Sequence, residues 1–149
     1  MKKQNLFRQL FFATLFCVSL SLNAQTSMPQ GKWEATQITI ERNVDGNTET
    51  TVYNSVTEVR SFIPFAQMWE IGAEEIVLHF SDGMEAVTDY TLEDNLLTIR
   101  ALGAILLYRL YSVNENELTL TATHNYAYNS PNEGLINIEE QWTIHLRKK

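Results

Sequence analysis

The side chains that could support chemistry in this 149-residue chain are three histidines, several acidic pairs and two arginines set in apolar segments. His79, His124 and His145 all fall in segments that predict strands, and their spacing matches no metal-binding motif. His79 and His145 occupy the polar phase of their strands, whereas His124 shares the phase of Leu118 and Leu120. We therefore predict that His124 points inward, and we predict no metal site.

Nucleophilic and phosphate chemistry have no supporting pattern. The sequence contains neither a Gly-x-Ser-x-Gly elbow nor a Gly-rich phosphate loop. The acidic pairs Glu74-Glu75, Glu93-Asp94 and Glu139-Glu140 are adjacent in sequence, which on a strand sends the two side chains to opposite faces. We interpret them as charges that keep the chain in solution. Neither an enzyme nor a cofactor is predicted.

Arg100 and Arg109 are different, because each interrupts an apolar strand-like segment. A guanidinium that faces an enclosed apolar cavity needs a partner, and a ligand carboxylate held by two hydrogen bonds would supply one. The alternative is pairing with Asp89 or Glu85 across strands, or extension to the rim. The candidate ligand-binding set, with its aromatic walls, is Arg100, Arg109, Tyr108, Tyr111, Phe80 and Tyr90.

The first strand-like segment has a break in its alternation. Its apolar positions are Trp33 and Ala35, then Ile38 and Ile40, so the period of two slips near Thr36-Gln37. A β-bulge at this point would bend the strand in the way that closure of a barrel requires.

Tight-turn residues divide the rest of the chain into strand-length segments. Asp82-Gly83 separates two alternating runs, the strongest hairpin signal in the sequence. Similar turns are predicted at residues 43–47, 93–95 and 114–116. The pattern predicts an all-β protein, an antiparallel up-and-down meander barrel of about eight strands.

Residues 61–72 fit neither strict alternation nor a long helix. Pro64 is suited to open a short helix, with Phe65, Met68 and Trp69 on one face. Together with Phe62, these residues are predicted to form either a cap packed on one barrel end or a mobile lid over a ligand.

The segment 104–111 is apolar in both phases. Both faces of this strand are therefore expected to contact protein, and we favour cover by residues 62–71 over cover by another subunit.

The first 24 residues have the form of a secretory signal peptide. A basic start, an apolar run over 10–22 and a small residue at Ala24 give this pattern, and the run is too short to predict a membrane span. Cys17, the one cysteine, lies within it, and lipid attachment there is disfavoured because Thr14-Leu15-Phe16 precedes it. Residues 25–149 are predicted to be one domain, exported to the periplasm, the cell surface or the medium.

The formal net charge of the chain is −7, with the acidic residues scattered along it. Nucleic acids are bound by clustered Lys and Arg, so we do not expect such a partner.

Three places in the sequence resemble the lipocalin-like small β-barrel domains of exported bacterial proteins. They are Gly31-Lys32-Trp33, the hairpin segments around residues 78–83 and 90–99, and the close formed by 108–110, 118–120 and 146–149. The resemblance implies a barrel over most of residues 31–149. It also implies that Trp33 packs across the closed end, with Arg147 over its ring, a structural contact worth about 0.5–2 kcal/mol.

Two functions are expected from this reading. The first is an exported binding protein that holds a small apolar or amphipathic ligand inside the barrel, which an eight-stranded barrel has room for. The alternative is a filled barrel that acts through its surface as an interaction, inhibitor or envelope module, with the 62–71 segment or the turn at 129–134. The oligomeric state is not predicted.

Overall fold

The computed structural model describes residues 27–59 and 65–149, and these form nine strands and one short 3-10 helix. The elements are β1 (Gly31–Val44), β2 (Asn47–Tyr53), η1 (Val56–Glu58), β3 (Ala66–Ile71), β4 (Glu75–Phe80), β5 (Glu85–Glu93), β6 (Leu96–Ala101), β7 (Ala104–Val113), β8 (Glu117–Ser130) and β9 (Gly134–Lys148). Sequential strands from β3 to β9 pair antiparallel, and β1 pairs with both β3 and β9. This closes an antiparallel up-and-down barrel of eight strands, so the predicted fold class is confirmed.

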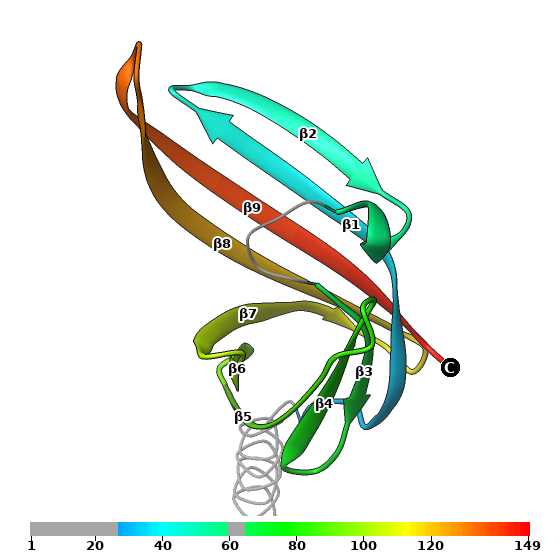
Figure 1. The fold of residues 1–149 in the computed structure, drawn as a ribbon. Helices are drawn as coiled ribbons and strands as arrows, with labels where there is room; N and C mark the ends of the chain where they lie inside the picture. The colour runs from blue at the N-terminus through cyan, green and yellow to red at the C-terminus, as the bar shows by residue number, and fades with distance from the viewer. Residues whose placement is uncertain (1–26, 60–64) are drawn as a thin grey trace, which may run out of the picture.

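Strand β2 is the ninth strand and lies outside the closed ring. One edge of β1 pairs with β3 over Gly31–Glu34 and with β2 over Ile38–Val44. β8 and β9 also extend beyond the barrel. β7 pairs only with Leu118–Thr121 of β8, which runs on to Ser130. The remaining halves of these strands form a four-stranded sheet, β2-β1-β9-β8, that rises from the barrel (Figure 1). We call this sheet, residues 38–53 and 122–144, the extension.

The predicted bulge in β1 is confirmed. The register between β1 and β9 shifts between Ala35 and Gln37, and the Thr36 hydroxyl donates a 3.2 Å hydrogen bond to the His145 carbonyl. Because of the extra residue, Ala35 and Ile38 both point inward and are buried. One strand can thereby serve both the barrel and the extension with the same buried face.

Three hairpins turn on two residues with positive φ. Asp45-Gly46, Asp94-Asn95 and Leu102-Gly103 have φ values of 49° and 86°, 48° and 65°, and 54° and 76°. A turn with two such residues matches the twist of the flanking strands. Asn, Asp and Gly adopt positive φ values at the lowest energetic cost. Leu102 is the exception, because a leucine backbone is strained in the left-handed region.

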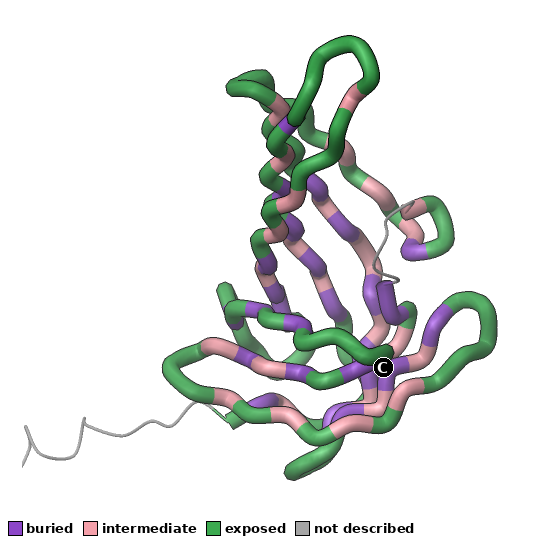
Figure 2. Tube along the Cα trace, turned by 60° about the vertical axis from the view of Figure 1, so that its left-hand side comes forward, coloured by how far each residue is buried: buried purple, intermediate pink, exposed green. Residues whose placement is uncertain are grey.

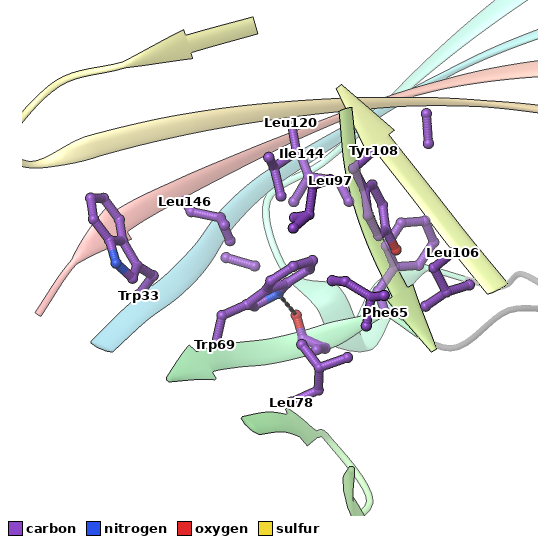
Figure 3. Packing of buried hydrophobic residues seen from close by; sticks show 14 of the residues in the cluster. Trp33, Phe65, Trp69, Leu78, Leu97, Leu106, Tyr108, Leu120, Ile144 and Leu146 are labelled. Atoms are coloured by element: carbon purple, nitrogen blue, oxygen red, sulfur yellow. Dashed lines mark hydrogen bonds between the residues drawn. The ribbon is translucent and has the colours of Figure 1, made fainter. Parts of the chain in front are cut away.

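Packed side chains fill the barrel interior (Figure 3). The inward residues Leu97, Ile99, Leu118 and Leu120 are 0% exposed, and the three tryptophans, Trp33, Trp69 and Trp142, are at most 2% exposed. Trp69 meets Tyr108 edge to face, with ring centroids 5.6 Å apart. A void large enough for a small molecule would leave accessible surface on the side chains around it. The inward side chains of the described residues show almost none.

The short helix expected after Pro64 is wrong for the described residues of that segment. Residues 66–71 form β3, a wall of the barrel, in which Trp69 stands opposite Trp33 and Leu78. A register shift between Ala66 and Met68 breaks the alternation, which is why the sequence does not read as a strand. Met68 and Trp69 therefore form part of the wall rather than a cap or lid, whereas Phe65 precedes β3 and is buried against Trp142. Phe62 lies outside the described residues.

The outer face of β7 is exposed rather than covered. Ile105, Leu107 and Tyr111 are 59%, 49% and 79% exposed. Since residues 66–71 belong to the wall, the cover predicted from that part of the chain is wrong. Exposed and buried residues alternate along the extension as well (Figure 2).

Within residues 27–59 and 65–149, no helix has the length and apolarity needed to cross a membrane. The predicted signal peptide lies outside this part of the chain and stays a prediction.

Candidate functional site

A charged pair lies on the inward face of the extension, just beyond the barrel. Arg42 of β1 stands opposite Glu140 of β9, which in turn stands opposite His124 of β8. Glu140 is only 3% exposed because Ile138, Glu140 and Trp142 share the inward phase of β9. The side chain of Arg42 is 45% exposed, so one member of the pair reaches solvent.

Every hydrogen bond to the Glu140 carboxylate comes from a neighbouring strand or from its own. Oε1 accepts from Arg42 Nε at 2.7 Å and from the Tyr126 hydroxyl at 2.8 Å, and a terminal guanidinium nitrogen of Arg42 lies 2.6 Å away. Oε2 accepts from Trp142 Nε1 at 3.0 Å. We call these four residues, Arg42, Tyr126, Glu140 and Trp142, the Glu140 network. It joins β1, β8 and β9 at one point.

The network keeps the carboxyl group ionised despite its burial. Burial alone would raise the pKa of Glu140, but the hydrogen bonds from Arg42, Tyr126 and Trp142 outweigh it and lower the pKa. The bond to Glu140 raises the pKa of Arg42. Burial, followed by the bond to Glu140, raises the pKa of Tyr126. The ion pair is therefore fully charged near neutral pH.

His124 lies beside the Glu140 network. Its side chain points inward, as predicted. Its ring lies 3.9 Å from the Trp142 ring, centroid to centroid, and Trp142 also packs against Phe65 at 4.4 Å. Burial lowers the pKa of His124, and the Glu140 charge offsets part of that effect. Its Nε2 is buried and has no hydrogen-bond partner among the described residues. The imidazole is thus held neutral, with one polar atom unsatisfied.

A hollow of about 730 Å³ adjoins the network near the end of the extension, and Tyr126 belongs to both. Three amide side chains and two carboxylates are its main polar features. The lining consists of Asn43, Asp45, Gly46, Asn125, Tyr126, Ala127, Asn137, Ile138 and Glu139. Its volume falls within the usual range for small-molecule sites.

A smaller hollow of about 350 Å³ lies over the β1 bulge. Thr36, Gln37, Thr119 and His145 contribute to it, and Thr119 Oγ1 lies 3.3 Å from His145 Nδ1. The Thr36 and Thr119 hydroxyls are already engaged with β9, so this hollow is largely a consequence of the bulge.

On the barrel wall, His79 joins three strands. Its Nε2 lies 3.1 Å from Glu70 and its Nδ1 lies 2.9 Å from Glu85, while Lys32 pairs with Glu70 at 2.8 Å. The hydrogen bond from Lys32 is the main cause of a lowered pKa of Glu70. In the part of the chain that the structure describes, the His, Asp and Glu side chains form no group that could hold a metal ion.

The structure divides the predicted ligand-binding set. Phe80 and Tyr108 are buried in the core, where burial raises the pKa of Tyr108, and Tyr111 is exposed. The hydroxyl of Tyr90 donates to the carbonyls of Gly72 and Ala73 at 3.1 and 3.0 Å.

Arg100 and Arg109 are exposed, in the phase opposite to buried Ile99 and Tyr108. Neither side chain faces the barrel interior, so the cavity-facing alternative considered for them is wrong. Their role in ligand binding stays a prediction.

The cation over Trp33 is Lys148 rather than Arg147. Lys148 pairs with Trp33 in register and its Nζ lies 5.6 Å from the ring centroid, whereas Arg147 pairs with Glu34. Adjacent strand residues face opposite sides, so a shift of one residue changes which of them reaches the ring. Trp33 itself is fully buried at the barrel end, and its Nε1 donates to the Pro29 carbonyl at 3.0 Å.

Sequence reasoning missed Arg42, Tyr126 and Glu140. The acidic pair Glu139-Glu140 was correctly expected to point to opposite faces of a strand, but its interpretation as surface charge holds only for Glu139. The phase of β9 was the available signal, because Glu140 alternates with Trp142, Ile144 and Leu146. Of its partners, only Arg42 comes from a strand far away in sequence, because Tyr126 lies across the β8–β9 hairpin and Trp142 is on β9 itself.

No protein-family model matches the chain, and neither the curated proteins nor the solved structures contain a significant match.

Proposed function

We propose that this chain is a non-enzymatic binding module whose barrel is filled and whose ligand is held by the hollow at the end of the extension. The proposal follows the surface-acting alternative from the sequence, but with a different surface. Met68 and Trp69 of the predicted cap belong to β3 in the wall, and the polar groups gather instead on the extension.

Packing argues against a ligand inside the barrel. The inward side chains from all eight barrel strands form one continuous core, to which three tryptophans contribute. Admitting a molecule there would require large side chains to leave their positions, at a cost of several kcal/mol. The extension end needs no such rearrangement.

The observation that carries the proposal is that polar side chains from three paired strands line one face of the extension at the hollow. Asn43 of β1 and Asn125 of β8 both stand opposite Glu139 of β9. On the other face, the Glu140 network ties the same three strands together. Binding groups held in place by a supporting layer of hydrogen bonds lose little entropy when a ligand arrives. The strands beneath the hollow are therefore held in a fixed arrangement.

The lining indicates the chemical class of the ligand. Asn43, Asn125 and Asn137 offer groups that both donate and accept hydrogen bonds, as hydroxyl groups do. Asp45 and Glu139 make the hollow unfavourable for anions. A neutral, hydroxyl-rich molecule such as a saccharide suits this set better than a fatty acid.

Calorimetric titration with a panel of neutral oligosaccharides and fatty acids tests the proposal. We expect an oligosaccharide to bind, and Asn137→Ala to weaken it by about fivefold, the usual effect of one lost hydrogen bond. Asn132→Ala removes the same amide from the adjoining loop, outside the hollow, and should leave the affinity unchanged. Binding of fatty acids alone, unaffected by Asn137→Ala, would contradict the proposal.

Export and kinship with lipocalin-like barrels are part of the same proposal. The signal-like residues 1–24 and the eight-stranded meander support them. Release of a shortened chain, beginning near residue 25, into the periplasm or medium would be the corresponding observation.

A further inference from the structure

The upper half of β8 has an open backbone edge. β8 pairs with β9 along its whole length, but β7 pairs with it only up to Thr121. Beyond that point β7 turns away while β8 continues upward with β9 (Figure 1). Residues 122–130 therefore have a paired neighbour on one side only, among the described residues, and we call them the β8 open edge.

This edge lacks the features that usually protect one. Natural edge strands carry Lys, Pro, inward charges or bulges that prevent pairing with another chain. From Leu118 to Ser130 the sequence contains no Lys, Arg, Asp, Glu, Pro or Gly. The other outer strand of the extension, β2, carries Glu49 and is shorter. The β8 open edge is thus the longer and the uncharged one.

We propose that the β8 open edge pairs antiparallel with the same edge of a second copy of this chain, across a two-fold axis at Tyr126. The axis follows from the length of the edge, because Tyr126 is its midpoint and all nine residues then pair. His124 would face Tyr128 of the second copy, and Thr123 would face Asn129 of the second copy. The two four-stranded extensions would become one continuous eight-stranded sheet.

The composition of the edge permits a second copy as the occupant. Across a two-fold seam each side chain faces side chains of the same segment, so charged residues there would meet their like and repel. Residues 122–130 carry no charged side chain, and the seam therefore has no such penalty. Self-pairing about a two-fold axis also needs no second, complementary surface, and such interfaces are the commonest in soluble oligomers.

Sedimentation equilibrium of the purified chain, with two double variants, tests both the edge and the register. Thr123 and Asn129 are exposed, lie outside the hollow and face neutral residues on β9. Thr123→Lys with Asn129→Lys puts like charges opposite each other twice across the seam. We expect this variant to raise the dimer dissociation constant by about tenfold or more.

The matched variant, Thr123→Lys with Asn129→Glu, puts opposite charges together, and we expect its dissociation constant to stay within about threefold of that of the unaltered chain. Circular dichroism and urea unfolding confirm that both variants fold. A chain that remains monomeric at all concentrations overturns the proposal. So does a dimer that both variants weaken equally, or that neither affects, because its seam would then lie elsewhere.

Discussion

Glu140 lies where the barrel continues into the extension, and its hydrogen bonds join the strands there. A buried carboxylate is costly unless hydrogen bonds and an opposite charge satisfy it. Here Arg42, Tyr126 and Trp142 supply both, from three strands that are paired at this level. Removing the charge therefore disturbs β1, β8 and β9 together.

Glu140→Gln keeps the shape of the side chain but removes its charge. We expect the free energy of unfolding at pH 7 to fall by about 1–3 kcal/mol, because the bonds to Arg42 lose their ionic character. The control is Glu139→Gln, its exposed neighbour, which should change stability by less than about 0.5 kcal/mol. Urea unfolding measures both.

The same pair has a defined pH dependence. Because the pKa of Glu140 in the folded chain is below its ordinary value of 4.5, its contribution is complete above that value and is lost as the pH falls through the folded pKa. The stability gap between the unaltered chain and Glu140→Gln should therefore close at acid pH. A gap that stays constant at every pH below 4.5 would contradict the role of the charge.

His124 predicts a second, separate pH effect. Burial lowers its pKa below the ordinary 6.5, so the unfolded chain binds more protons between the two values. Stability should rise with pH across that window and level off above about pH 7. His124→Phe should flatten this slope in urea unfolding followed from pH 5 to pH 8. An unchanged slope would place the titrating group elsewhere.

At the scale of elements, turns and alternation were readable from the sequence, whereas partner strands were not. Asp82-Gly83 and the Ala35–Ile38 phase slip predicted a hairpin and a bulge because both signals are local. The irregularity between Ala66 and Met68 hid β3, since a shifted register destroys alternation in a six-residue strand. The Glu140 network was hidden for another reason, because Arg42 and Tyr126 meet Glu140 only through the pairing of β9 with β1 and β8, whose register the sequence pattern does not specify.

The β6–β7 turn offers a stabilising change. Leu102 adopts φ 54° and is 50% exposed, so its side chain contributes little packing while its backbone is strained. Leu102→Asn should raise the free energy of unfolding by about 0.5–1 kcal/mol, because Asn tolerates this conformation. Leu135→Asn, an exposed leucine in a regular strand, should not stabilise. A lower melting temperature for Leu102→Asn would show that its side chain packs after all.

Under the proposed function, the molecule separates stability from recognition. The barrel holds most of the core, and the extension carries the polar network, the hollow and the β8 open edge. The sequence predicted an eight-stranded barrel, because that requires only the number and order of strands. It could not predict the extension, which exists because β1 shares one edge between β2 and β3.

A filled barrel predicts the response to a core deletion. Leu120→Ala removes a fully buried inward side chain and should cost about 2–5 kcal/mol. The resulting apolar cavity should bind a molecule such as benzene, detectable as recovered stability. Leu107→Ala, on the exposed outer face of β7, should do neither. Binding of benzene by the unaltered chain would indicate an existing cavity.

The measurement that separates a filled barrel from a carrier most directly is methyl NMR during titration with oligosaccharides and fatty acids. We expect an oligosaccharide to shift the methyl signals of Ala127 and Ile138 beside the hollow while those of Leu97, Ile99 and Leu120 stay unchanged. Saturable shifts of Leu97, Ile99 and Leu120 with a fatty acid, while Ala127 and Ile138 stay unchanged, would place the ligand inside the barrel and contradict the proposed function.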